Sequence, residues 1–276
     1  MLGKIIKQEF KGTWKFFAVS FSAFTLAVIA LRLTVEPYMS NINSPGILGT
    51  VFFIIMLLAF IVITALFSFT PTLVNVIRFY KTTVTTRGYL THTLPVSTDK
   101  LILGKLIVAS LWQLLTTLYA VAAFVILFFS LNIFDPYLIG YDLTSVIGRI
   151  ITADSKAFAT VILIIVSSFI TMISAVLKFY CAMSIGQSFN KNKVLFSILA
   201  YLGIHIICSI VGTCFGVSTT ITLQLNTFTP QMMEILISIL KAFFMPAIKL
   251  IVIDLAFAAA YYILTRHFLK NKLNLS

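Results

Sequence analysis

Few residues in this chain have the type and spacing needed for chemistry. No two histidines or cysteines have the spacing of metal ligands, so we expect no metal site. The residues in question are His92, His205, His267, Cys181, Cys208 and Cys214. The sequence also lacks the HExxH and GxSxG motifs of hydrolases, and we therefore predict no catalytic residue.

Two charged residues, Lys249 and Asp254, interrupt an apolar segment near the end of the chain. A carboxylate in the middle of a membrane span costs at least about 2.5 kcal/mol, so Asp254 should face other helices, a cavity or a subunit interface. In such a position the Asp254 side chain either contacts substrate on a translocation path or forms an interhelical hydrogen bond. An intramembrane enzyme that uses Asp254 with His205 is the alternative from another functional class.

The composition excludes an ordinary soluble enzyme. Of the 276 residues, 60% are apolar and only 10% are charged, whereas soluble domains have about a quarter charged. The net charge of +12 comes from short basic clusters between long apolar runs. This pattern favours contact with an anionic membrane surface and not with nucleic acid.

A helix needs about 20 apolar residues to cross about 30 Å of hydrocarbon, and six segments satisfy this requirement. We predict an all-α integral membrane protein that forms a single transmembrane domain, 1–276. The predicted spans are about 16–35, 47–70, 101–131, 157–186, 194–217 and 242–265.

Lysine and arginine alternate with the spans and so predict the orientation. The segments before the first span, between the second and third, between the fourth and fifth, and after the sixth are basic, whereas the intervening ones are neutral or slightly acidic. Because short cytoplasmic loops carry the excess of Lys and Arg, both termini should be cytoplasmic.

The first fifteen residues predict an interfacial helix. Lys4, Lys7, Lys11 and Lys15 cluster on one side of a helical wheel, and apolar residues occupy the other. Trp14, beside Lys15, suits the headgroup boundary. The alternative is a flexible basic tail.

The connection at residues 71–100 should be cytoplasmic. A helical period continues beyond Pro71, Gly88 breaks it, and a new helix should start at Thr98 and run to Leu131. Such a helix is about 50 Å long and projects beyond the bilayer. A further segment, 230–244, is apolar but too short to cross before Pro246, and predicts a re-entrant or outer-leaflet helix.

Polar residues within the spans are candidates for a translocation pathway. Gln113, Ser168 and Thr171 join His205 and Asp254 in this set. Packing between helices explains small and hydroxylated residues equally well, because they permit close approach and interhelical hydrogen bonds.

Several segments along the whole length resemble the permease subunits of bacterial ABC exporters of the ABC-2 type. They are MLGKIIKQEFKGT at the start, RFYKTTVTTRGYLTHTLPVSTDKLILGK from Arg78 to Lys105, KFYCAMSIGQSFNKNKVL from Lys178 to Leu195, and YYILTRHFLKNKLNL at the end. The central segment is the most specific. Its matching residues are Gly88, Leu90, Leu94, Pro95, Ser97 and Lys105.

The resemblance implies six helices, an amphipathic N-terminal elbow, a cytoplasmic coupling helix and re-entrant outer helices. The coupling contact would comprise Arg87, Gly88, Tyr89, Leu90, Leu94 and Pro95. Arg87 departs from the family, which often has an acidic residue before this glycine. The chain lacks the GxxxxGK[ST] phosphate loop, so ATP and Mg²⁺ would bind to partner subunits.

The function that follows is one half of a translocation pathway in the bacterial cytoplasmic membrane. Two ABC ATPase subunits and a second permease, identical or paralogous, would complete the exporter in the lipid bilayer. The apolar and aromatic spans favour an amphipathic peptide, a lipid or a hydrophobic drug as substrate. A membrane anchor or immunity protein that transports nothing is the remaining alternative.

Overall fold

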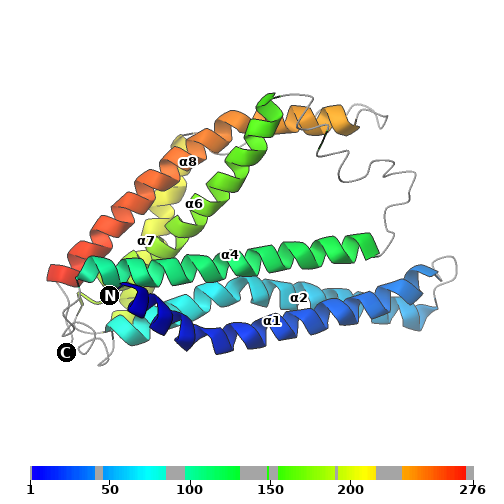
Figure 1. Cartoon of the computed structure of the whole chain (residues 1–276), viewed down its shortest axis with the longest axis horizontal. Coiled ribbons are helices and arrows are strands. Elements are labelled where there is room, and N and C mark those ends of the chain that lie inside the picture. Colours follow the sequence, from blue (N-terminus) through cyan, green and yellow to red (C-terminus); the bar gives the residue numbers. More distant parts are fainter. Residues whose placement is uncertain are drawn as a thin grey trace. The chain divides into compact units, whose positions relative to one another are not determined.

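The computed structural model describes residues 2–40, 46–84, 97–130, 148, 155–189, 192–215 and 232–271. Helices dominate this part of the chain, and no strand occurs in it (Figure 1). The elements are α1 (Leu2–Ser40), α2 (Ile47–Phe79), the π-helical η1 (Tyr80–Val84), α4 (Thr98–Ser130), α6 (Ser155–Gly186), α7 (Lys193–Cys214) and α8 (Met232–Asn271).

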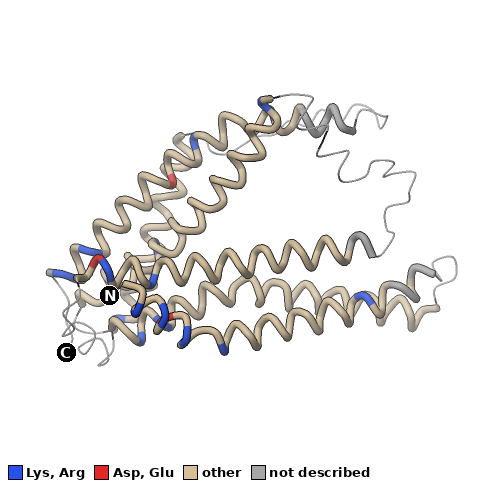
Figure 2. Tube along the Cα trace, viewed as in Figure 1, with Lys and Arg blue, Asp and Glu red and all other residues tan. Residues whose placement is uncertain are grey.

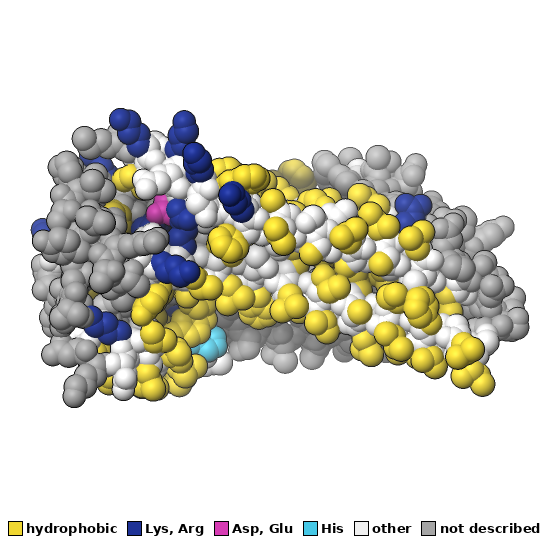
Figure 3. Space-filling model, turned by 90° about the horizontal axis from the view of Figure 1, so that it is seen from below, with side chains coloured by type: hydrophobic (Ala, Val, Ile, Leu, Met, Phe, Trp, Pro, Cys, Tyr) yellow, Lys and Arg dark blue, Asp and Glu magenta, His cyan; other side chains and the backbone are white. Residues whose placement is uncertain are grey.

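Six of these helices are long and apolar enough to cross a membrane. Large apolar side chains cover the outside of the helices instead of being buried, as Phe16, Leu26 and Leu66 illustrate. Figure 3 shows such a face, with Lys and Arg gathered toward one end. An apolar surface of this extent is stable only against lipid or other protein. The all-α, multi-pass membrane fold is confirmed.

The chain divides into two compact units. In the first unit α1 packs against both α2 and α4. Its core is aromatic: Phe24 is fully buried and stacks on Phe67 with ring centroids 4.2 Å apart. Thr25 and Tyr119 share a hydrogen bond of 2.5 Å between α1 and α4. Charged residues gather where α1 begins, α2 ends and α4 begins (Figure 2).

Helix α1 continues without interruption from Leu2 to Ser40, so the predicted boundary between an elbow at 1–15 and a span from 16 is not a break in the helix. The first turns nevertheless bend away from the rest of α1 (Figure 1). The Thr13 hydroxyl donates to the carbonyls of Glu9 and Phe10, both at 3.1 Å. A threonine that bonds back to its own helix in this way often bends it.

The first part of the predicted connection, 71–100, is helical, because α2 runs through Pro71 to Phe79 and η1 continues to Val84. The helical period that the sequence showed beyond Pro71 is thus confirmed. The start of the next helix at Thr98 is confirmed too, and α4 has 33 residues. Residues 85–96 lie outside the described part of the chain.

The second unit contains α6, α7 and α8, and α6 packs against both of the others. The observed bounds of α6 and α7 agree with the predicted spans 157–186 and 194–217 within three residues. The half of α6 nearest Gly186 supplies the core, with Leu177, Tyr180 and Cys181 buried. Asn192 precedes α7 with φ 54°, a left-handed conformation that asparagine tolerates better than most residues.

Helix α8 corrects another predicted boundary, since it includes both the segment 230–244 from Met232 onward and the last span in one helix. Pro246 lies inside it, and the helix changes direction part-way along (Figure 1). A proline removes one backbone donor and kinks a helix, but strong helix formers on both sides allow the helix to continue. The short helix predicted at 143–151 falls outside the described residues apart from Gly148.

Gly186 allows α6 and α7 to meet closely. A Cβ at this position would lie 2.6 Å from the Ser197 backbone nitrogen and 2.7 Å from its Cα. Backbone atoms cannot rotate away, so Gly186→Ala should destabilise the protein by about 1–3 kcal/mol. Gly203→Ala on α7 is the matched control, because nothing lies within 4 Å of its Cβ position. Thermal unfolding of the purified variants in detergent measures both, and an equal response would contradict the close contact.

Candidate functional site

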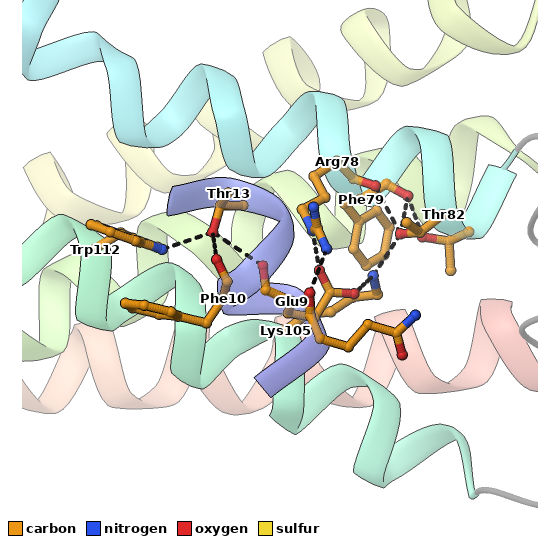
Figure 4. A network of polar contacts seen from close by, with 10 residues as sticks. Glu9, Phe10, Thr13, Arg78, Phe79, Thr82, Lys105 and Trp112 are labelled. Atoms are coloured by element: carbon orange, nitrogen blue, oxygen red, sulfur yellow. Dashed lines mark hydrogen bonds and ion pairs between the residues drawn. The ribbon is translucent and has the colours of Figure 1, made fainter. Parts of the chain in front are cut away.

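Glu9 is the centre of a polar cluster at one end of the first unit (Figure 4). Its side chain is only 12% exposed and its two carboxylate oxygens accept from two cations on two other helices. Arg78, in the last turn of α2, donates through Nε to Oε2 of Glu9. Lys105, in the second turn of α4, donates through Nζ to Oε1 at 2.7 Å. One carboxylate thereby joins α1, α2 and α4.

Each cation has a second acceptor in the cluster. Lys105 also donates to the hydroxyl of Thr82 in η1 at 2.5 Å, and Arg78 donates through Nη2 to the carbonyl of Gln8 at 3.1 Å. Thr82 in turn donates to the carbonyl of Arg78 at 2.7 Å. The π-helical turn is therefore part of the cluster, and π-helical turns are frequent at functional positions.

Gly12 makes room for the Arg78 guanidinium. A Cβ at residue 12 would overlap the end of the Arg78 side chain, whereas Gly3 in the same helix has nothing within 4 Å of its Cβ position. The absence of a side chain at residue 12 thus lets the guanidinium lie against α1 within reach of Glu9.

Trp112 of α4 fixes the neighbouring turns of α1. Its indole ring stacks on Phe10 at 4.8 Å and on Phe17 at 4.0 Å, and its Nε1 donates to the Thr13 hydroxyl at 2.9 Å. Thr13, Phe17 and Trp112 are all buried. This apolar contact and the ion pairs hold the same stretch of α1 against α4.

Burial makes the cluster sensitive to the loss of any member. Lys105 is only 5% exposed, and a buried ammonium is tolerated only with acceptors that replace its hydration. If Glu9 were removed, two cations would face each other without a counter-charge. The arrangement is suited to holding α1, α2 and α4 together.

The cluster lies next in sequence to residues 85–96, which contain the predicted coupling residues. Arg78 and Thr82 lie just before residues 85–96, and Lys105 lies in the helix that follows them. The predicted coupling residues Arg87, Gly88, Tyr89, Leu90, Leu94 and Pro95 all lie outside the described residues. Their placement stays a prediction, but the elements on both sides are tied to Glu9.

The lysines of the predicted elbow project away from this cluster. Lys4, Lys7, Lys11 and Lys15 are all exposed, and Trp14 beside them is 46% exposed. The opposite face is covered: Ile6 packs against the Phe17, Val108 and Trp112 group. The amphipathic pattern read from the sequence is therefore present in the structure.

In the second unit, Asp254 lines a cavity of about 180 Å³. The Thr171 hydroxyl of α6 donates to Asp254 Oδ2 in α8, so the structure brings two of the predicted pathway residues together. Lys178 and Tyr261 also line the cavity, and Tyr261 shares a hydrogen bond of 2.6 Å with Cys208 of α7.

The other pathway candidates are not part of this cavity. Ser168 is exposed and donates to the Ile165 carbonyl of its own helix at 2.8 Å. His205 is exposed and stacks on Tyr201 at 6.2 Å. Gln113 belongs to the first unit and is half-buried. His205 is not among the residues that line the cavity with Asp254, and in the described residues no group of three potential ligands could hold a metal ion.

Sequence reasoning missed Glu9, although a signal was present. Glu9 is the only carboxylate in the first 35 residues, and on a wheel of about 100° per residue it falls opposite the four lysines, in the apolar half. A single acid on the buried face of a basic helix indicates a buried ion pair.

Comparison with family models, curated proteins and solved structures found no match to the chain.

The buried position of Glu9 predicts a large effect of Glu9→Gln, which preserves size and removes the charge. Leaving Arg78 and Lys105 without a counter-charge should cost about 3–5 kcal/mol of stability. Combining it with Lys105→Met should recover part of the loss, because one of the uncompensated cations is removed. Denaturant or thermal unfolding of the two single variants and the double variant measures these changes in stability. Lys7→Gln, an exposed change in the same helix, is the control, and an equal response from it would refute the assignment.

Gly12→Ala tests whether the Arg78 guanidinium needs the space beside residue 12. Alanine favours a helix over glycine by about 1 kcal/mol, so Gly3→Ala should stabilise the protein slightly. Gly12→Ala should instead lower the melting temperature, because Arg78 must move and a charge-assisted hydrogen bond is worth about 1.5–3 kcal/mol. The penalty should vanish in an Arg78→Gln background. A penalty that persists there would show that Gly12 acts through something other than Arg78.

Proposed function

We propose that this chain is the permease subunit of an ATP-driven ABC exporter of the ABC-2 type. Six spanning helices, the alternation of basic segments along the sequence and the resemblance of the Arg78–Lys105 segment support the proposal. The observation that carries it is the Glu9 cluster, which ties the N-terminal elbow to both helices that border residues 85–96.

A coupling segment transmits force only if its ends are firmly attached. Arg78 and Lys105 bind the same carboxylate, so a push on residues 85–96 reaches α2 and α4 together. Helix α4 has 33 residues and is about 50 Å long, which is enough to carry the movement from outside the hydrocarbon across it. Rigid helices with two arrangements are a known means of such coupling.

In this proposal the chain itself does not hydrolyse ATP. Two partner ATPase subunits bind ATP and Mg²⁺, and their closure displaces residues 89–94. A second permease, identical or paralogous, completes the pathway. The alternation of basic segments along the sequence supports a cytoplasmic location, in a bacterial cell, for the termini and residues 85–96 in this proposal. The substrate is an amphipathic peptide, a lipid or a hydrophobic drug.

Isolation from the native membrane in a mild detergent tests this function. The tagged chain should bring with it a soluble subunit that contains a Walker A loop and an ABC signature, and the complex should hydrolyse ATP. Mass spectrometry identifies the subunit. Recovery of the folded chain without any ATPase would contradict the proposal.

Charged substitutions in residues 85–96 should uncouple the complex. Tyr89→Asp with Leu90→Asp should reduce ATPase recovery or stimulated ATP turnover by about tenfold, since burying an unpaired charge in a contact costs at least about 1–3 kcal/mol. Asn41→Asp with Asn43→Asp adds the same charge to a predicted external connection and should change neither. Unchanged ATPase recovery and unchanged ATP turnover in the Tyr89→Asp, Leu90→Asp variant would contradict the coupling assignment.

A further inference from the structure

Helix α1 presents a row of lysines on one face of its first turns. At ~100° per residue the row falls within a sector about 80° wide, and it extends about 16 Å along the axis. Its members are all exposed, and none makes an ion pair with a described residue. Figure 3 shows Lys and Arg side chains that stand out beside hydrophobic ones at this end of the molecule. The row consists of Lys4, Lys7, Lys11 and Lys15.

The acid on the same turns does not neutralise this row. Glu9 is the only carboxylate in the first 35 residues, and it lies on the opposite side of the helix. Its two oxygens accept from Arg78 and Lys105 there. The lysine row is therefore a positive surface without a counter-charge among the described residues, and such a surface attracts anions.

The rest of α1 places the lysine row at a membrane surface. The helix has 39 residues and is about 58 Å long, whereas the hydrocarbon of a bilayer is about 30 Å thick. No charged residue occurs from Phe16 to Leu31, so the hydrocarbon begins directly after Lys15. Trp14 and Phe10, which are 46% and 39% exposed, lie beside the row as aromatic residues do in the headgroup region.

The shape of the row favours a lipid surface over a single soluble anion. A site for one phosphate gathers its donors around one point, whereas these lysines are spread along the helix. The exposed rings of Trp14 and Phe10 also need an apolar environment, which acyl chains supply at the membrane boundary. Together the charges and the rings fit the surface of an anionic bilayer.

We infer that the lysine row of α1 is a binding surface for anionic phospholipids of the phosphatidylglycerol type, which gather there in preference to neutral phospholipids. The headgroup phosphates accept from the lysines, and the aromatic rings contact the acyl boundary. Because Glu9 lies across the same turns, the bound lipids hold the junction of α1, α2 and α4 at the level of the headgroups. This inference does not rest on the exporter function, because lipid binding at α1 requires no ATPase.

The two tryptophans of the chain allow a direct measurement. Trp14 is 46% exposed beside the lysine row and Trp112 is 7% exposed, so a quencher carried by lipid reports mainly on Trp14. The full-length chain is reconstituted in nanodiscs of phosphatidylcholine that contain a minor fraction of either brominated phosphatidylglycerol or brominated phosphatidylcholine. Trp14→Phe should remove most of the quenching and so identifies the signal.

The brominated anionic lipid should show at least about a fivefold preference for Trp14 over the neutral one, which is the contribution of about one lysine near an anionic surface. Lys7→Gln with Lys11→Gln should lower this preference below about twofold. Arg32→Gln with Lys249→Gln is the matched control, because it also removes two exposed cations and leaves the row intact. It should keep the preference of the parent.

Salt and soluble phosphate test the unmodified chain in the same nanodiscs. Raising the ionic strength from about 0.1 M to about 1 M shortens the screening length from about 10 Å to about 3 Å and should abolish most of the preference. Inorganic phosphate, compared with chloride at equal ionic strength, should not reduce it. Equal quenching by the two lipids, an unchanged preference in the Lys7→Gln, Lys11→Gln variant, or specific displacement by phosphate overturns the inference.

Discussion

The structure of the first unit depends on one buried carboxylate. Glu9 accepts from Arg78 and Lys105, and thereby neutralises cations from two helices that its own helix would otherwise repel. In water such pairs contribute little, but at 12% and 5% exposure for Glu9 and Lys105 the missing hydration must be replaced by protein groups. Three helix ends are held in one place as a result, and the apolar contacts of Trp112 then extend along α1 and α4.

The second unit treats its charges differently. Asp254 accepts a hydrogen bond from the Thr171 hydroxyl and makes no ion pair in the part of the chain that the structure describes, although Lys178 lines the same cavity. The core there is formed by close backbone approach at Gly186 and by Tyr180 and Cys181 of α6, so the charges are not needed for packing. The first unit therefore contains a buried, paired cluster, whereas the Asp254 carboxylate of the second unit is held by a hydroxyl and makes no ion pair among the described residues.

Composition and periodicity predict the six apolar helices, the start of α4 at Thr98 and the helical continuation beyond Pro71, because the length and period of the local hydrophobic pattern determine them. The same reasoning placed breaks near residue 15 and before Pro246, where the structure bends its helices without interrupting them. The distinction between a kink and a break depends on what packs around the helix, and that is not local information. The role of Glu9 was not predicted for the same reason. Its partners Arg78 and Lys105 are 69 and 96 residues away in sequence.

Our central proposal is that the Glu9 cluster anchors residues 85–96, and that these residues form a cytoplasmic segment on which a partner ATPase acts. Its most direct test is the side of the membrane on which residues 85–96 lie. Leu90→Cys, introduced after replacement of Cys181, Cys208 and Cys214 by alanine, is treated with a membrane-impermeant maleimide in intact cells and in permeabilised cells. We predict labelling only after permeabilisation, and labelling of Asn43→Cys in intact cells. Labelling of Leu90→Cys in intact cells would contradict the account.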